Sequence, residues 1–463
     1  MCYFFWIILS TFFVSVTVAT QSRIRNVDVA VIGGGVSGTY AAVRLYDQRK
    51  DIVLIETHDY LGGNTETYSD PSTNTPVDIG VEIFENTSTV LDYFARFKIP
   101  LAKADLTVPG TTKYLDFSTG KPVSGPALSS NPQDQAAAFA IYSAQQAKYP
   151  YLSSGYHLPD SVPPDLLLPF GRFVQKYNLT AALPLISLFC EGFGDLITVP
   201  TLYILRYLDS DFLDYVSSNK FLTTAAHNNS LLYSAAQSLL GQSVLLRSRV
   251  MSVSRPTQGR VILSVATPTG MESIRAKRIL VAFPQLLSNF AGWDLDDTTE
   301  RFLFSRFHAT GWYTALLQNT GIPANLTLQN AGSETPFNLP SLPAVYNIGP
   351  SPVPGLLHVY YGNIANYTLA NVQNALVATL DRLRGFGVIP SGGKVQIPIL
   401  RSHTPYALRV DVSDIKARFY DRLYALQGYR GTYYTGAAFQ RPVSSSIRQY
   451  TDEVLETLQW DFE

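Results

Sequence analysis

Cysteine is nearly absent from this sequence. The 463 residues contain only two, Cys2 and Cys190, and Cys2 lies in an apolar N-terminal segment. Removal of that segment would leave one cysteine, so no internal disulfide could form. We therefore expect the folded chain to be stabilised by its hydrophobic core and by any ligand that it binds.

Charged residues are also scarce, and neither sign dominates. Asp, Glu, Lys and Arg make up 15% of the chain, below the roughly 25% of typical soluble domains. The formal net charge is -1, so no global field attracts polyanions and nucleic acid is not an expected partner. The six histidines lack metal-ligand spacing and no Gly-x-Ser-x-Gly sequence is present, so we expect neither a metal site nor a serine hydrolase.

The N-terminal segment is apolar and carries no charged side chain from Cys2 to Ala19. It ends in Thr17-Val18-Ala19, which has the small-x-small form of a signal-peptide cleavage site. An uncleaved membrane anchor is the alternative, but the segment is short for a span of about 20 apolar residues. We expect residues 1–19 to be a signal peptide, the protein to be secreted or lumenal, and no stable membrane span to remain after cleavage. Sequons that permit N-glycosylation stand at Asn86, Asn178, Asn228, Asn325 and Asn366.

A glycine-rich turn follows the first strand-like run after this segment. Val27–Ile32 is short and β-branched, which is typical of a parallel strand buried on both faces. The run Gly33-Gly34-Gly35-Val36-Ser37-Gly38 comes next, residues 40–45 have helical spacing, and residues 52–56 indicate a second buried strand that ends in Glu56. This order predicts the βαβ unit of a dinucleotide-binding domain.

The turn has the residues that such a site requires. Gly33 would make the tight turn, Gly35 would let backbone N–H groups approach a pyrophosphate, and Gly38 would permit close helix packing. Glu56 would accept hydrogen bonds from the ribose hydroxyls. An unrelated glycine-rich loop is the alternative, but strand, helix, strand and acid in register favour the dinucleotide site. The predicted binding residues of this part are Gly33, Gly35, Val36, Ser37, Gly38 and Glu56.

The residues after Glu56 resemble those of FAD enzymes. Leu61-Gly62-Gly63 lies five residues past the acid, as in the flavin amine oxidase and glutathione reductase superfamily. The paired glycines would let the backbone turn beneath the flavin's diphosphate and ribityl chain. Asp78–Glu82 is similar to the superfamily segment that runs near the isoalloxazine ring. The resemblance implies FAD rather than a nicotinamide cofactor.

Two later stretches extend this resemblance. Residues 243–250 resemble the superfamily segment in which a residue at the place of Val250 clamps the adenine through its backbone. Residues 431–438 lead into a helix expected over 444–458, whose N-terminal dipole could stabilise reduced, anionic flavin. The further cofactor contacts implied by the resemblance are Gly62, Gly63, Asn64, Val250, Gly436 and Ala437.

Four segments resemble one family more closely. Residues 61–68, 78–84, 93–97 and 433–439 are similar to the β-cyclopiazonate dehydrogenases, flavoproteins of fungal secondary metabolism. The resemblance covers most of the chain after the N-terminal segment. It implies two-electron dehydrogenation of a small-molecule intermediate, in some cases with ring closure, and reoxidation of the flavin by oxygen or another acceptor.

Departures from the wider superfamily bear on how FAD is held. Asn64 stands where relatives often have Arg or His, and Ala437 stands where amine oxidases usually have Glu or Asp. The cysteinyl-flavin bond of the monoamine oxidases is excluded unless Cys190 reaches the ring. We expect noncovalent FAD, with His58 as a less favoured attachment site.

The domain organisation follows from these motifs. We expect an α/β architecture in which a discontinuous Rossmann-like FAD-binding domain is interleaved with an α+β substrate-binding domain. The FAD-binding segments are 27–101, 234–293 and 398–463, and the substrate-binding segments are 102–233 and 294–397. Helices are expected over 131–148 and 165–177, and the Pro-rich stretches 150–164 and 321–354 are expected to be loops or lids.

No motif identifies the catalytic residues. Flavin-dependent oxidation can rely on holding the substrate against the ring, so Tyr406 and Tyr434 are candidate aromatic walls, and His308 is a candidate proton relay. An ordinary packing role is the stronger alternative for each. Two other functions stay open: an amine or amino acid oxidase that releases hydrogen peroxide, with Arg172 or Arg206 as a substrate anchor, and a noncatalytic flavin-binding protein.

Overall fold

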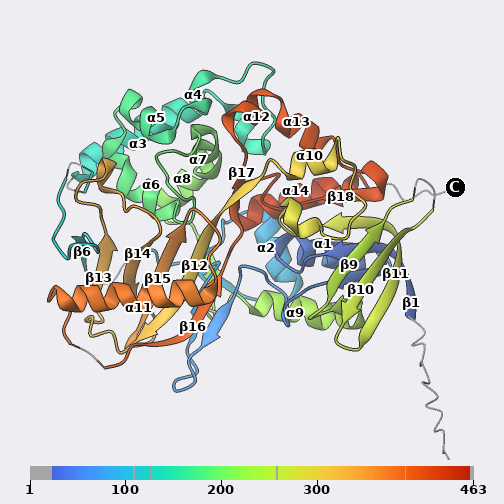
Figure 1. Cartoon of the computed structure of the whole chain (residues 1–463), viewed down its shortest axis with the longest axis horizontal. Coiled ribbons are helices and arrows are strands. Elements are labelled where there is room, and N and C mark those ends of the chain that lie inside the picture. Colours follow the sequence, from blue (N-terminus) through green and yellow to red (C-terminus); the bar gives the residue numbers. More distant parts are fainter. Residues whose placement is uncertain are drawn as a thin grey trace, which may run out of the picture.

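The computed structural model describes residues 23–107, 110–125, 127–128, 130–256, 259–391 and 393–458. Two large sheets, each with its own helices, lie at opposite ends of the elongated molecule (Figure 1). The predicted signal peptide, residues 1–19, lies outside the described residues. No helix in the described ranges is long and apolar enough to cross a membrane.

The first sheet has β1 near its centre, with β2 and β11 parallel to it on either side. Strand β8 follows β2 at one edge, β10 and β9 continue antiparallel from β11, and β18 also pairs with β11. From Val27 onward the β-branched residues of β1 are buried, as are those of β2, because helices cover this part of the sheet. The bounds are β1 Arg23–Ile32, β2 Ile52–Ile55, β8 Val244–Leu245, β9 Arg249–Ser254, β10 Val261–Thr267, β11 Gly270–Val281 and β18 Thr432–Tyr434.

Helix α1, Val36–Asp47, connects β1 to β2 and completes the predicted βαβ unit. It packs against α9, Leu231–Leu240, and against α14, Ser444–Glu456, so chain segments from three distant parts of the sequence surround the glycine turn. Helix α2, Ser88–Arg96, packs on α14 in turn. Because α1 begins directly after the turn, its N-terminus lies at the carboxyl edge of β1.

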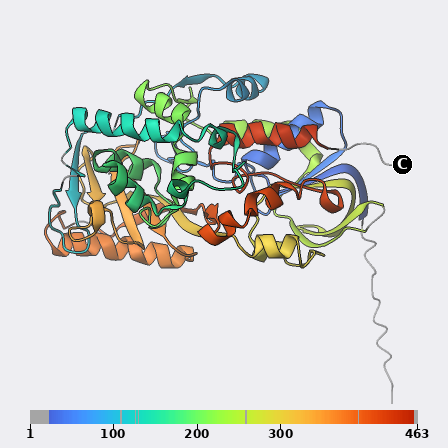
Figure 2. The same ribbon diagram turned by 90° about the horizontal axis from the view of Figure 1, so that it is seen from above.

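The second sheet has the order β16-β12-β15-β14-β13-β6, with β17 also paired to β12. Helix α11, Leu369–Gly385, crosses one face, and α3 to α8 lie on the other side of the sheet (Figures 1 and 2). Alternation along β15 directs Leu357, Val359 and Tyr361 into the core with α11. The residues between them therefore point away from α11. The bounds are β6 Thr111–Leu115, β12 His308–Gln318, β13 Leu326–Asn330, β14 Ala344–Pro350, β15 Leu356–Asn363, β16 Gln396–Ser402 and β17 Tyr406–Arg409.

The remaining elements form two small sheets and the helical layer. Strands β3 and β4 pair with each other, as do β5 and β7. These strands span β3 Thr67–Ser69, β4 Pro76–Asp78, β5 Leu101–Lys103 and β7 Leu222–Thr224. The other helices are α3 Pro132–Gln146, α4 Pro164–Leu167, α5 Phe170–Tyr177, α6 Leu183–Phe189, α7 Thr201–Tyr207, α8 Ser210–Ser217, α10 Glu300–Phe304, α12 Val412–Lys416 and α13 Phe419–Tyr424.

The observed elements bear on three sequence-based expectations. Strands β16 and β17 pair with β12 in the second sheet, although most of their residues fall in the predicted FAD-binding segment 398–463. The stretch 321–354 is not wholly loop, because it contains β13 and β14. Its prolines lie outside these strands except Pro350, the last residue of β14, and cross-strand pairing compensates for the weak local pattern. The helix expected over 165–177 is divided into α4 and α5, with Pro169 as the residue before α5.

Candidate active site

One cavity of about 1860 Å3 is lined by residues of both large sheets and of the loops between them. Single-ligand pockets usually measure roughly 300 to 1,000 Å3. The cavity therefore has room for a dinucleotide and a second molecule. We refer to the part lined by the glycine turn as the cofactor end and to the part lined by the second sheet as the substrate end.

The glycine turn is shaped by very close backbone contacts. A Cβ atom on Gly38 would lie 1.8 Å from the carbonyl oxygen of Gly33, so a larger residue here would displace α1 from β1. Gly35 is the N-cap of α1 and provides no side-chain cap. The first-turn N–H groups of α1 are therefore available to a ligand, and Val36 and Ser37 line the cavity. This arrangement fits a diphosphate.

The second glycine pair touches the first turn. A Cβ atom on Gly63, whose φ is +58°, would lie 2.9 Å from the Cα of Gly35, and the Gly62 N–H donates to the carbonyl of Gly34 at 2.8 Å. Both Gly62 and Gly63 line the cavity. A side chain at Gly63 would therefore push the two turns apart.

Glu56 organises this end of the cavity. Its Oε2 accepts a hydrogen bond from the Gly34 N–H at 2.6 Å, and its Oε1 accepts one from the His58 N–H at 2.7 Å. The carboxylate lines the cavity and thus fits the predicted ribose contact, but it also holds the glycine turn in place. Sequence reasoning did not anticipate this second role.

The other predicted cofactor residues converge on the same cavity. Val250 lies on β9, and Gly436 and Ala437 follow β18 at the N-terminal end of α14. These three residues and Asn64 all line the cavity although they are distant in sequence. The residues present therefore fit FAD, with α1 and Gly62-Gly63 suited to the diphosphate and Glu56 to the ribose.

The substrate end has an aromatic wall made by the face of the second sheet that points away from α11. Trp312 of β12 stacks on Tyr360 of β15 with ring centroids 6.3 Å apart. The His358 ring also stacks on Tyr360, with ring centroids 5.9 Å apart. Tyr406 of β17 lies 5.0 Å from Trp312. Burial lowers the pKa of His358 to about 4, so this imidazole is neutral at physiological pH.

Two carboxyl groups stand at this wall. Glu82 lies in the loop after β4 and accepts a hydrogen bond from the Tyr360 hydroxyl at 2.6 Å. Glu191 follows α6 and accepts one from the Asn347 amide at 2.8 Å. Desolvation by the surrounding protein raises the pKa of Glu82 to about 7 and that of Glu191 to about 8, and the charge of Glu82 contributes to the shift of Glu191. Sequence reasoning did not select either residue, although Glu82 ends the segment that it placed near the flavin.

Positive charge is scarce around this cavity. Among the described lining residues, only Arg249 and Arg401 carry a permanent positive charge, and Arg401 is paired with Glu66 at 2.6 Å. Arg172 is exposed on α5 outside the cavity lining, and Arg206 is buried beside Asp209. Neither of the two arginines proposed as an anchor can therefore receive an amino acid carboxylate in this cavity.

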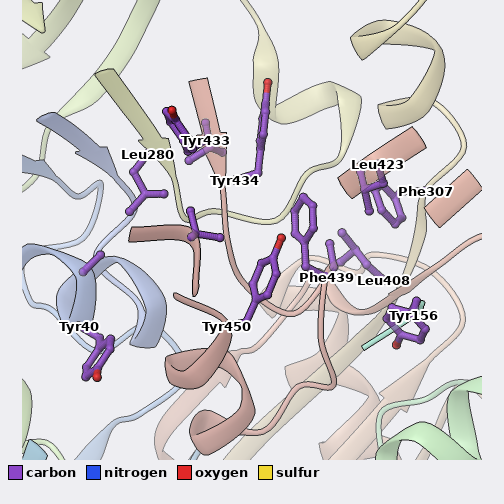
Figure 3. Close-up of a cluster of buried hydrophobic side chains, with 14 of the residues drawn as sticks. Tyr40, Tyr156, Leu280, Phe307, Leu408, Leu423, Tyr433, Tyr434, Phe439 and Tyr450 are labelled. Atoms are coloured by element: carbon purple, nitrogen blue, oxygen red, sulfur yellow. The ribbon is translucent and has the colours of Figure 1, made fainter. Parts of the chain in front are cut away.

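Of the three catalytic candidates, only Tyr406 lines the cavity. Tyr434 lies within the buried cluster that contains Phe439 and Tyr450 (Figure 3), and its hydroxyl donates to Glu300 at 2.7 Å. His308 is exposed and its Nε2 lies 3.9 Å from Asp411. The predictions for Tyr434 and His308 are corrected, because packing and strand direction carry both side chains away from the cavity.

The two candidate attachment residues also line the cavity, at different ends. His58 is next to the Glu56 carboxylate at the cofactor end. Cys190 is buried, and burial raises the pKa of its thiol well above the ordinary range. A thiolate is the nucleophilic form of cysteine, so this environment disfavours a cysteinyl bond.

Comparison with known proteins agrees with this geometry. Residues 31–97 match the NAD(P)-binding Rossmann-like domain family. The conjugated linoleic acid-producing fatty acid isomerase of P. acnes has a similar fold, with a TM-score of 0.72 at 19% identity over 95% of this chain and 99% of that one. Cyclohexylamine oxidase from Brevibacterium oxydans gives a TM-score of 0.64 at 17% identity over 93% and 99%. Fold and site together define a protein with a Rossmann-like FAD-binding domain.

The sequence relatives identify the family. The FAD-dependent oxidoreductase oblC of Cochliobolus heterostrophus is 40% identical over 92% of this chain and 89% of its own length. The β-cyclopiazonate dehydrogenase of Aspergillus flavus is 32% identical over 93% and 92%. The chain belongs to this family of FAD-dependent oxidoreductases, and it is an enzyme that acts on a small molecule.

Proposed function

We propose that the protein binds FAD noncovalently and dehydrogenates a neutral intermediate of fungal secondary metabolism. The observation that carries this proposal is that the glycine turns and the aromatic wall line one shared cavity. When bound, FAD supplies the acceptor for the two electrons removed from the substrate. The aromatic wall orients the substrate, and the surrounding sheets exclude water.

The shortage of positive charge supports a neutral substrate. Glu82 and Glu191 would repel an anion. At the substrate end the described cavity lining has no lysine, and its one arginine, Arg401, is paired with Glu66. Arg249 also lines the cavity, but it stands beside Val250 on β9 at the cofactor end. The name of the Aspergillus relative states that it acts on β-cyclopiazonate, which agrees with a role in oxidising such intermediates. We propose oxygen or another small acceptor as the reoxidant, and ring closure as a step that can accompany the oxidation.

The visible spectrum of the purified protein tests the cofactor. We expect a yellow protein whose colour passes to the supernatant on acid precipitation, because no described nucleophile is suited to attach the flavin. A yellow pellet would show covalent attachment and direct attention to His58 or Cys190. A colourless protein that takes up no added FAD would contradict the proposed function.

The substrate is tested with an extract from a strain that lacks the gene, in which the unconsumed intermediate accumulates. Added anaerobically to the FAD-loaded protein, this extract is expected to bleach the flavin absorption. Extract from the parent strain serves as the control and should bleach it less. Equal bleaching by both extracts would contradict a dedicated biosynthetic substrate.

Amine oxidation with release of hydrogen peroxide is the second candidate. The two carboxyl groups at the aromatic wall favour it, since they would stabilise a bound ammonium group. Peroxide formation with simple primary amines would support this candidate, whereas oxidation of a neutral compound alone would exclude it.

We also propose that the protein enters the secretory pathway. The apolar segment before Thr20 supports this route, and the sequon asparagines Asn86, Asn178, Asn325 and Asn366 are exposed. Secreted protein from a fungal host should begin near Thr20 and lose mass on treatment with an N-glycosidase. An unchanged mass together with an intact N-terminus would contradict the proposal.

A further inference from the structure

The loop that carries Glu82 is held from three sides. The Val81 N–H donates to the carbonyl of Asn64 at 3.0 Å, and the Asn229 amide donates to the carbonyls of Val81 and Glu82 at 2.9 and 3.0 Å. His403 contacts the carbonyl of Ile79 at 3.1 Å. The backbone of the loop is therefore fixed relative to both the glycine turn and the second sheet.

The Glu82 carboxyl group has one occupied and one open oxygen. Its Oε1 accepts the Tyr360 hydroxyl. Within the part of the chain that the structure describes, Oε2 has no hydrogen-bond partner, and the side chain is accessible from the cavity. Oε2 of Glu82 is thus available as a hydrogen-bond acceptor in the cavity next to the aromatic wall. Packing alone does not explain a carboxyl group at this place.

The groups around Glu82 keep its pKa at about 7, close to physiological pH. The titratable neighbours are Asp78 on the same loop, Tyr360 and His358 on β15, Glu191 after α6, and His403 before β17. Burial lowers the pKa of both His358 and His403 to about 4, so they stay neutral near pH 7. Asp78, whose pKa burial raises to about 6, is already bonded to Thr67 and the Asn229 N–H.

We propose that Glu82 is the proton acceptor for substrate oxidation and that Tyr360 is its positioning residue. This inference rests on the proposed function. The substrate is a molecule with a hydroxyl or amine N–H beside the carbon that is oxidised. The carbon gives up a hydride, for which bound FAD is the acceptor, and the O–H or N–H proton passes to Oε2 of Glu82. A C=O or C=N bond forms, and the substrate loses two electrons and two hydrogens in total.

The position of Glu191 fits this assignment. Its carboxyl group belongs to the other domain, is bonded to Asn347, and interacts with Glu82 through like charge. Two like carboxyl groups in one buried site ionise in separate steps. We assign the first of these steps to Glu82, whose Oε2 is open to the cavity, so that Glu191 keeps its proton when Glu82 acts as the base.

A pH titration of the visible spectrum of the FAD-loaded full-length protein tests the ionisation without any substrate. Wild type should show a transition near pH 7, because a charge that forms in the cavity perturbs the flavin absorption. Glu82→Gln should abolish it. Tyr360→Phe should move it to higher pH, since the lost hydrogen bond favoured the ionised form. Glu191→Gln should leave it near pH 7, because a protonated Glu191 adds no charge when Glu82 ionises. A transition that persists unchanged in Glu82→Gln would overturn the proposal.

Anaerobic flavin bleaching by the extract from the gene-deletion strain provides the second measurement. Glu82 must be ionised to accept a proton, so the wild-type rate should rise as the pH passes through about 7. Glu82→Gln should bleach about 100-fold or more slowly and lose this pH dependence while it keeps its FAD. Equal rates in wild type and Glu82→Gln would refute the role of Glu82. Failure of the extract to bleach wild type would instead refute the proposed function, and the titration would still decide the ionisation.

Discussion

Glu56→Ala is expected to yield a folded protein that loses its FAD during purification. The substitution removes the acceptor of the Gly34 and His58 N–H groups and the expected acceptor of the ribose hydroxyls. Hydrogen bonds to a charged group contribute roughly 1.5 to 3 kcal/mol each. Loss of one such bond should weaken FAD binding about 10- to 100-fold, and loss of the turn geometry should weaken it further.

The dissociation constant for FAD, measured by flavin fluorescence quenching on reconstitution, checks this result. Asp59→Asn is the matched control, because Asp59 also lines the cavity but is exposed and paired only with Arg247 at 2.8 Å. The control should retain FAD as wild type does. Unchanged flavin content in Glu56→Ala would remove Glu56 from the cofactor site.

Arg255→Met is expected to cause the largest loss of stability. The Arg255 side chain is fully buried and makes a bidentate pair with Glu300, at 2.5 and 2.8 Å, and a further bond to Asp294 at 2.8 Å. Glu300 is also fully buried and accepts the hydroxyl of Tyr434. Removal of the arginine leaves a buried, uncompensated carboxylate, which typically costs about 3 to 5 kcal/mol.

Thermal unfolding with saturating FAD measures this loss, and we expect a Tm several degrees below that of wild type. The double variant Arg255→Met with Glu300→Gln should recover part of the loss, since its buried amide carries no charge. Arg301→Met is the control, because Arg301 of α10 pairs with Asp297 at an exposed position and its loss should cost less than about 1 kcal/mol. Equal Tm values for Arg255→Met and Arg301→Met would show that the buried pair does not hold β9, α10 and β18 together.

The sequence by itself determined the cofactor end of the site. The run from Gly33 to Gly38, the acid Glu56 and the pair Gly62-Gly63 act through local backbone geometry, in which turn, helix start and strand follow one another within about thirty residues. Such geometry depends on residue type and spacing alone. The distant residues Val250 and Gly436 could be placed only through family resemblance, and both line the cavity.

The substrate end was decided by tertiary structure. Its wall takes Trp312, His358 and Tyr406 from three strands, and its carboxyl groups come from a loop of one domain and a loop of the other. With 28 tyrosines in the chain, no local pattern distinguishes one that faces a cavity, such as Tyr406, from one that is packed in the core, such as Tyr434. Which side chains meet there depends on strand pairing and register, and a shift of one residue turns each strand's side chains to the opposite face.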